Sequence, residues 1–299
     1  MSIAKQKKLT LITMLAVPTI LLIIFVIYPL VNMILLSFQK WDGSSADKIW
    51  VGFKNYYRLF TNSPVSWRAL LNNGMYLFFG LAIIPLQILI SGLITSGLRG
   101  ANFYKVTIFL PYIINSVAIG YAFSFFFSPV SGGFNGLLQM LHLDNLIQHW
   151  LSDENVVNFT LNFVSYWKVF GFNIVLISAA LTSISTDQLE SASVEGANVF
   201  QKLWYIQIPQ IGKTLNIIVF MTIAGALQVF DIPFIMTSGG PNYASTTFSL
   251  YAINLAFKYE DYGLAASMAV ILILFILIIN GFPKLIKKLV GGVARVRRS

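Results

Sequence analysis

The sequence contains no cysteine, and only 10% of its 299 residues are charged. The absence of cysteine excludes disulfides, thiolate metal sites and cysteine nucleophiles. A water-soluble domain normally carries about 25% charged residues, so a soluble enzyme of one or two domains is nearly excluded as well. The chain is instead rich in apolar residues: 57% are hydrophobic and 15% are aromatic, and they occur in long blocks. This composition predicts that the bilayer is the solvent.

Negative charge is also scarce, because eleven Asp and Glu stand against twenty Lys and Arg, a net charge of +9. In a chain this apolar, the positive charge indicates contact with anionic lipid headgroups rather than with nucleic acid. The basic tail from Lys284 to Arg298 is interpreted in the same way. No extramembrane stretch is long enough to hold an ATPase or another sizeable catalytic domain. We therefore expect no enzymatic activity in this chain.

Six apolar stretches are long enough for transmembrane helices, which need about 20 residues each. They predict an all-α membrane protein with both termini on the same side of the bilayer. The apolar run of the first stretch is too long for a signal peptide, and no cleavage site follows it, so we expect it to be retained. The expected spans are Leu9–Leu36, Leu70–Leu98, Val106–Phe127, Phe159–Ile184, Thr214–Met236 and Tyr262–Ile286.

The distribution of Lys and Arg decides which side holds the termini. If the termini are inside, thirteen of the twenty basic residues fall in inner segments and seven in or near outer ones. We therefore expect both termini in the cytoplasm. The resulting division is a cytoplasmic tail at 1–8, a first span at 9–36, an outer loop at 37–69, a five-helix core at 70–286 that contains an inner loop at 185–213, and a basic cytoplasmic tail at 287–299.

The inner loop at 185–213 is the most informative segment. Ser185 and Gln188 have the spacing of a capping box, and Pro209 is expected to end the segment. A helix that lies on the bilayer surface is normally rich in Lys and Arg, whereas the helical part of this loop has only Lys202. A slim helix that docks into another protein is therefore the favoured interpretation, with a surface-bound helix as the alternative. The apolar and small residues at helical steps are Leu189, Ala192, Gly196, Phe200 and Leu203.

This loop resembles the EAA loop of ABC importer permeases. Its matching residues are Glu190-Ser191-Ala192, Glu195-Gly196-Ala197 and Ile206-Gln207-Ile208-Pro209. Ser191 and Ile208 are mild departures from the family's Ala and Leu. The resemblance extends over nearly the whole chain and is closest to carbohydrate-uptake permeases of the maltose or multiple-sugar type, although the extra helices and large insertion of the maltose example are missing. The other shared features are Tyr28-Pro29, Ser37-Phe38, Val51-Gly52-Phe53-Lys54-Asn55-Tyr56, Leu110-Pro111, Gly133-Phe134-Asn135-Gly136-Leu137-Leu138, Trp167-Lys168, Phe230-Asp231 and Ser238-Gly239-Gly240-Pro241.

The resemblance implies a multi-pass permease subunit of a type I ABC importer in a bacterial inner membrane. The implied partners are a second permease, two cytoplasmic ATPases, an extracytoplasmic solute-binding protein and a carbohydrate cargo. ATP and Mg²⁺ would be bound by the ATPases, and this chain would hold no cofactor. Residues Thr186–Phe200 would form the coupling helix that seats in the ATPase, with Glu190 meeting a basic or hydroxyl group and Gly196 permitting close backbone approach. The implied coupling residues are Glu190, Ala192, Glu195, Gly196, Ala197 and Phe200.

Two charges lie inside predicted spans, where charges are costly and usually mark a pathway or a pair. Aspartate is too short to reach the interface easily, so we expect Asp231 to face the pathway or an adjacent helix, with Lys168 as a possible partner. Sugar sites combine aromatic walls with a few polar groups. Residues of these kinds in the spans are expected to line the substrate pathway, with helix–helix hydrogen bonding as the alternative for each. They are Asn115, Tyr121, Trp167, Asn173, Gln228 and Asp231.

Two other functions stay open at this point. An ABC permease for polyamine would need several pathway carboxylates, where only Asp231 is available, and one for phosphate would need arginines deep in the spans. An ion-driven secondary transporter predicts inverted repeats, broken helices and ionisable residues at the midplane, and the sequence shows none of these clearly. His142 and His149 lack the spacing of metal ligands, so we expect no metal site.

Overall fold

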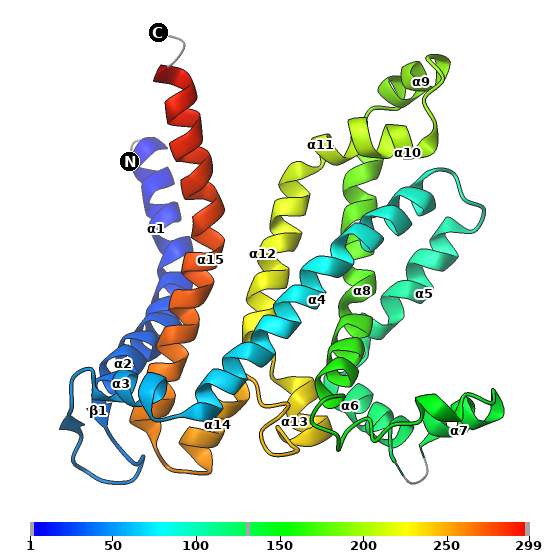
Figure 1. The fold of residues 1–299 in the computed structure, drawn as a ribbon. Helices are drawn as coiled ribbons and strands as arrows, with labels where there is room; N and C mark the ends of the chain where they lie inside the picture. Colours follow the sequence, from blue (N-terminus) through cyan, green and yellow to red (C-terminus); the bar gives the residue numbers. More distant parts are fainter. Residues whose placement is uncertain (1–2, 130–131, 297–299) are drawn as a thin grey trace. The chain divides into compact units, whose positions relative to one another are not determined.

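The computed structural model describes residues 3–129 and 132–296 (Figure 1). The chain divides into two compact units, one made of residues 1–63 and 252–274 and the other of residues 64–251 and 275–299. Each unit is described here by itself. The side chains of the expected basic tail at 287–299 lie outside the described part of the structure, so its contact with lipid stays a prediction.

The first unit begins with the first expected span. Helix α1 (Ile3–Leu22), a π-helical turn η1 (Ile23–Ile27) and helix α2 (Tyr28–Ser37) follow one another without a break. The π turn comes just before Pro29, which has no backbone N–H to donate. Thr10–Ser37 is long and apolar enough to cross a bilayer, as expected from the sequence.

Residues 39–61 of the first unit form a short hairpin and a helix, which we call the head. Strands β1 (Gln39–Lys40) and β2 (Ile49–Trp50) form an antiparallel hairpin, followed by α3 (Lys54–Thr61). Asn55 Nδ2 donates to the backbone oxygens of Ser37 and Gln39, at 2.9 Å each, which ties α3 to the end of α2. An ion pair of 2.7 Å between Arg58 and Asp261 joins this head to the start of α15 (Tyr262–Val296).

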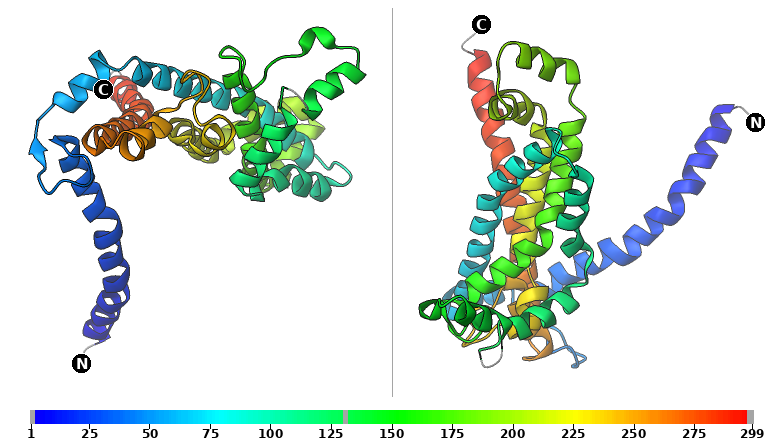
Figure 2. Two further views of the ribbon diagram at one scale, coloured as in Figure 1. Left: turned by 90° about the horizontal axis from the view of Figure 1, so that it is seen from below. Right: turned by 90° about the vertical axis from the view of Figure 1, so that its right-hand side faces the viewer.

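The second unit is built around four helices: α4 (Pro64–Thr95), α5 (Ala101–Ile113), α8 (Val157–Thr182) and α12 (Gly212–Gln228). Helix α8 packs against both α4 and α5, and α12 packs against α4 and α8, as the right-hand view of Figure 2 also shows. Two buried apolar clusters fill this bundle, one around Leu161 and one around Ile177. The elements of the unit are α4 (Pro64–Thr95), α5 (Ala101–Ile113), α6 (Ser116–Phe126), α7 (Gly133–Met140), η2 (Asp144–Leu146), α8 (Val157–Thr182), α9 (Thr186–Val194), α10 (Val199–Lys202), η3 (Leu203–Gln207), α11 (Ile208–Gln210), α12 (Gly212–Gln228), α13 (Asp231–Thr237) and the start of α14 (Phe248–Phe257).

One expected span is broken. Over the described residues, five helical stretches are long and apolar enough to cross a membrane, and α5 with α6 would make a sixth. The sequence predicted a single span at Val106–Phe127, whereas here α5 and α6 meet at 92°. Asn115 is the physical reason, because its side chain accepts a hydrogen bond of 2.7 Å from Val117 N and so begins a new helix. The five unbent stretches are Thr10–Ser37, Pro64–Thr95, Val157–Thr182, Gly212–Thr237 and Tyr262–Ile279.

Helices α5 and α8 approach each other very closely at Gly171. A Cβ atom at this position would lie 1.9 Å from the backbone oxygen of Ile108 on α5. Only a residue without a side chain fits there, so the contact is backbone against backbone.

The fifth span is also interrupted, between α12 and α13. Asn73 on α4 donates from Nδ2 to the backbone oxygens of Ala226 and Leu227, at 2.7 and 3.0 Å. Thr247 Oγ1 donates to the backbone oxygen of Val229 at 2.7 Å. Carbonyl groups freed at a helix end inside a membrane need such partners. The interruption is therefore a stable feature that side chains from distant elements support.

We expect Asn73→Leu to lower the thermal unfolding midpoint of the purified chain in detergent. The leucine leaves buried carbonyl groups without donors, at a cost of about 1–3 kcal/mol. Asn32→Leu is the matched control, because Asn32 is exposed and bonds only within its own helix, to Tyr28 O at 2.9 Å. Equal midpoints for the two variants would contradict this role of Asn73.

Candidate functional site

Both helix breaks open on one cavity at the end of the second unit that holds α6, α7 and α13 (Figure 1). The cavity has a volume of about 520 Å³. Non-helical backbone at membrane depth is tolerated only where it is buried in protein or lines a water-filled cavity. Two breaks around one cavity therefore make it the candidate functional site. The lining residues are Tyr112 to Val117 from the first break, Phe230, Asp231, Phe234 and Ile235 from the second, and Lys168 from α8.

The cavity contains one cationic and one anionic side chain. Lys168 Nζ donates a hydrogen bond to Ser116 Oγ at the start of α6. Asp231 is the first residue of α13 and is exposed. The direct Lys168–Asp231 ion pair considered from the sequence is not formed, because the described residues contain no ion pair of 4.0 Å or less between them. Lys168 is directed to a hydroxyl group instead.

The other expected pathway residues are spread over the second unit. Asn173 lines a neighbouring cavity of about 220 Å³ and donates to Gln87 Oε1 at 3.2 Å. Trp167 lines a separate aromatic cavity of about 540 Å³ between α4 and α8. Tyr121 and Gln228 line none of these three cavities and are exposed. The structure thus brings Asn115 and Asp231 together and separates the other four from them.

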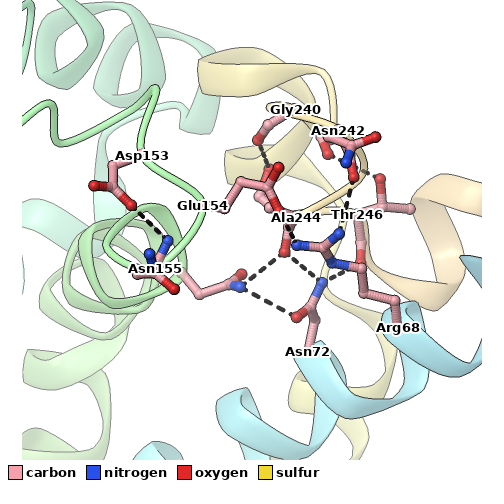
Figure 3. Close-up of polar contacts among 12 residues, drawn as sticks. Arg68, Asn72, Asp153, Glu154, Asn155, Gly240, Asn242, Ala244 and Thr246 are labelled. Atoms are coloured by element: carbon pink, nitrogen blue, oxygen red, sulfur yellow. Dashed lines mark hydrogen bonds and ion pairs between the residues drawn. The ribbon is translucent and has the colours of Figure 1, made fainter.

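Sequence reasoning missed a polar network beside the second break (Figure 3). Asn72 Nδ2 donates to the backbone oxygens of Ala244 and Thr246, at 2.7 and 2.8 Å. Asn158 Nδ2 donates to Ala244 O at 2.8 Å and to Asn72 Oδ1 at 3.1 Å. These amides fix the loop that follows α13 on the starts of α4 and α8. The signal available in the sequence was asparagine within an apolar span or next to one.

An ion pair between Arg68 and Glu154 extends this network (Figure 3). Arg68 Nη1 also donates to Asn242 O at 3.2 Å. The hydrogen bond from Arg68, assisted by Asn242, lowers the pKa of Glu154 below its usual value. The carboxylate is therefore charged at neutral pH and holds Arg68 against the loop.

The segment α9 to α11 lies at the opposite end of the second unit (Figure 1). The sequence predicted a single coupling helix at Thr186–Phe200, but α9 ends at Val194. Gly196 has a positive φ of +85°. Its N–H donates to Ser193 O at 3.0 Å, and Ala197 N donates to Ala192 O at 2.9 Å, which is the Schellman pattern of a helix end. The expected coupling helix is thus two helices joined by a turn at Gly196.

Two further expectations for this segment are wrong. Ser185 makes no side-chain capping bond, and the capping box lies at α10, where Asn198 and Gln201 bond each other's backbone N–H groups. Pro209 does not end the helical path, because it occupies the first turn of α11, where its missing N–H is tolerated. The π turn η3 precedes α11, and α12 follows it. The chain therefore continues from α11 into the fifth span.

The exposed side chains of this segment define what it can present to a partner. Glu190, Glu195 and Phe200 are exposed, whereas Ala192 is buried within the segment. Val194, which sequence reasoning missed, is 90% exposed at the end of α9. No neighbour lies within 4 Å of a Cβ built at Gly196, so within this chain the turn, and not close packing, explains the glycine.

Two side-chain bonds brace the segment. Gln210 Nε2 donates to Gln188 Oε1 at 2.7 Å, and Lys202 Nζ donates to Ser193 Oγ at 2.9 Å. They fix both ends of α9 to the helices that lead into α12. In the described part of the chain, no group of three or more His, Asp or Glu side chains is placed to hold a metal ion.

The chain is similar to several known transport proteins. It is 31% identical over 272 residues to the probable ABC transporter permease protein YurN of Bacillus subtilis, covering 88% of this chain and 91% of that protein. It is 29% identical over 290 residues to the diacetylchitobiose uptake system permease protein NgcF of Streptomyces coelicolor, covering 93% and 82%. Its fold matches a chain of a bacterial ABC transporter that imports the acidic polysaccharide alginate, with a TM-score of 0.82, 23% identity and coverage of 95% and 96%.

A family match agrees with these similarities. The family described as "Binding-protein-dependent transport system inner membrane component" matches residues 87–291, a range that includes both helix breaks, the cavity between them and the segment α9 to α11. The chain is therefore a multi-pass inner membrane protein with the fold of a type I ABC importer permease, and it belongs to the family of binding-protein-dependent transport system inner membrane components.

Proposed function

We propose that this chain is the permease subunit of an ABC importer for an oligosaccharide or a glycoside. The observation that carries the proposal is the cavity formed where two spans break, with Asn115 and Asp231 on its walls. Relatives named for diacetylchitobiose and for multiple sugars support the cargo class.

The chemistry of the cavity suits a neutral ligand rich in hydroxyl groups. Phe230 and Phe234 are stacked at 5.0 Å between ring centroids and offer apolar walls, while Asp231 and Lys168 can accept and donate hydrogen bonds. Such a mixture is typical of small-molecule sites. The chain offers one carboxylate and one ammonium here, which fits a neutral sugar better than a polyamine or phosphate.

The segment α9 to α11 would dock on an ATPase at the cytoplasmic face, and with six spans both chain ends would then lie in the cytoplasm. The partners in this proposal are a second permease, two ATPases that bind ATP and Mg²⁺, and an extracytoplasmic solute-binding protein. Closure of the ATPases would then move α12 through the braced segment as a rigid body. Glu190, Glu195 and Phe200 are exposed and available for this docking.

An ion-driven secondary transporter is less well supported. The 92° break between α5 and α6 is a feature of such proteins that the sequence did not reveal. The family nevertheless depends on a binding protein, and the exposed Glu190, Glu195 and Phe200 are available to a docking partner.

The function is tested by uptake into vesicles that contain the complete complex. Radiolabelled maltotriose, arabinotriose and diacetylchitobiose are supplied with the binding protein, and spermidine and an amino acid serve as comparisons. We expect ATP-dependent uptake of at least one sugar. Uptake of spermidine or the amino acid, with none of the three sugars taken up, would overturn the cargo class. Sugar uptake without ATP would overturn the importer type.

We expect Asp231→Asn to lower sugar uptake about tenfold, because a hydrogen bond to a charged group contributes about 1.5–3 kcal/mol. The variant keeps the shape of the side chain, so the unfolding midpoint should stay unchanged. Glu260→Gln is the matched control, since this exposed carboxylate lies outside both breaks. Wild-type uptake by Asp231→Asn would exclude Asp231 from the pathway.

A further inference from the structure

We propose that helix α7 lies in the outer leaflet of the bilayer, with one face among the lipid acyl chains. That face consists of Leu137, Met140 and Leu141 and is called here the α7 patch. The partner of the patch is therefore membrane lipid. The inference does not depend on the cargo, and only the word outer rests on the orientation given in the proposed function.

The α7 patch occupies one side of the helix. Leu137, Met140 and Leu141 recur at steps of three and four residues, so they share a face. Leu141 N donates to Leu137 O at 3.1 Å, which continues the helical turn past Met140. The exposed fractions of the three side chains are 49%, 83% and 59%. Adjacent apolar side chains exposed to this degree mark a surface that another apolar partner covers.

The other side of α7 is fixed to the bundle. Asn135 Oδ1 accepts a hydrogen bond of 2.7 Å from Trp150 Nε1, and Asn135 Nδ2 donates to Gln148 O at 3.2 Å. The ring of Phe134 lies 5.0 Å from that of Trp150 and 5.3 Å from that of Phe127, between centroids. These contacts hold α7 between the end of α6 and the segment that leads into α8. The fold therefore determines which face of α7 points outward.

The place and direction of α7 fit a membrane surface. Helix α7 lies at the end of the second unit where α8 begins, and it runs across the direction of α8 (Figures 1 and 2). Helix α8 is long and apolar enough to cross the bilayer. A helix that runs across α8 at its end is thus roughly parallel to the membrane plane, which is the orientation of an interfacial helix.

The charge pattern indicates that lipid, and not a soluble partner, covers the α7 patch. Between Lys105 and Asp144 the sequence contains no Asp, Glu, Lys or Arg. The uncharged run that forms α5 and α6 therefore continues through α7. A segment in contact with lipid excludes charge, whereas a protein interface has a polar rim. Helix α9, in contrast, contains Asp187 and Glu190.

Helix α7 has no Lys or Arg, although helices that reach a membrane surface on their own usually have them. Those charges attract such a helix to anionic lipid. Helix α7 does not need this attraction, because α6 and α8 belong to candidate spans of the same chain and keep it at the membrane. Burial of the α7 patch is then sufficient to hold the helix in the leaflet.

The chain has no cysteine, so a single fluorophore can be placed on either side of α7. Met140→Cys carries it on the α7 patch. The matched control is Gln139→Cys, because Gln139 is exposed and points away from the patch. Both variants are reconstituted as the complete complex in phosphatidylcholine vesicles without the binding protein. Since an interfacial helix buries its apolar face about 5–10 Å deep, we expect quenching by aqueous iodide to be at least about threefold weaker at position 140 than at position 139. Quenching by lipids with a nitroxide on the acyl chain should be stronger at position 140.

Three results would overturn the proposal. The first is equal quenching by iodide at the two positions. The second is protection from iodide at position 140 without quenching by the nitroxide lipids, because another subunit then covers the patch. The third is protection that begins only when the binding protein is added, which makes the patch a docking surface for that protein.

A charged substitution repeats the test without a label. The Met140 side chain is largely exposed within the chain, so in water Met140→Asp would leave the unfolding midpoint nearly unchanged. Among acyl chains the added carboxylate is costly. We expect Met140→Asp to lower the midpoint of the complex in vesicles by several degrees relative to Gln139→Asp, and equal midpoints would overturn the contact with lipid. Neither test measures uptake, so a failure of the proposed cargo leaves this inference intact.

Discussion

Gly171→Ala is expected to prevent this chain from reaching its folded state. The added Cβ would lie 1.9 Å from Ile108 O, and a backbone atom in a helix cannot move aside as a flexible side chain can. Overpacking in a well-packed core costs about 1–3 kcal/mol when side chains can adjust, so a backbone clash should cost more than that. The measurement is the yield of monodisperse protein from membranes and its unfolding midpoint in detergent.

The matched control is Gly225→Ala, which makes the same change inside helix α12. No atom outside its own helix lies within 4 Å of a Cβ built at Gly225. Alanine is favoured over glycine in a helix by about 1 kcal/mol, so this variant should be at least as stable as the parent. If Gly171→Ala has a yield like that of Gly225→Ala, the close approach of α5 and α8 is wrong.

Gly196→Val is expected to abolish most ATP-driven uptake while leaving the bundle folded. The turn at Gly196 needs a φ of +85°, and a β-branched residue there is strongly disfavoured. A strain of about 2 kcal/mol is enough to open the turn in most molecules, which corresponds to about a 30-fold loss. Uptake, ATPase pull-down and the unfolding midpoint are measured on the same preparation.

Gly196→Asn is the control for this effect, because asparagine adopts positive φ more readily than other residues with a side chain. We expect it to keep most of the uptake and of the ATPase binding. Since a Cβ at this position meets no neighbour within the chain, equal losses in both variants would instead point to steric exclusion of the partner. That outcome would contradict the turn as the reason for the glycine.

The spans were predictable because length and apolarity are local properties of the sequence. Thr10–Ser37, Pro64–Thr95 and Val157–Thr182 agree with the expected positions to within a few residues at most ends. The break at Ile114–Asn115 was not expected, because the hydrophobicity of a segment does not indicate where a side chain will cap a new helix. Asn115 was singled out as a polar group of the pathway, yet its capping role depends on the local backbone.

The site was only partly predictable, because its contacts join distant parts of the chain. Asn73 bonds carbonyl groups of residues 226 and 227, and no spacing rule links positions so far apart. Lys168 and Asp231 were matched by charge alone, whereas the fold gives the ammonium a nearer hydroxyl partner. In the inner loop, Gly196 was expected to permit close backbone approach, whereas the structure shows a turn with a positive φ at this position.

The short length of α5 has a consequence for the size of the movement that transport requires. A helix of 13 residues is about 20 Å long, while the hydrocarbon layer is about 30 Å thick. In the proposed import, a solute that enters from the outer face and reaches the bend has crossed about 10 Å and still has about the length of α5 ahead of it. The movement that releases the solute must therefore open a passage along most of α5, and the same stretch is available to block small ions between turnovers.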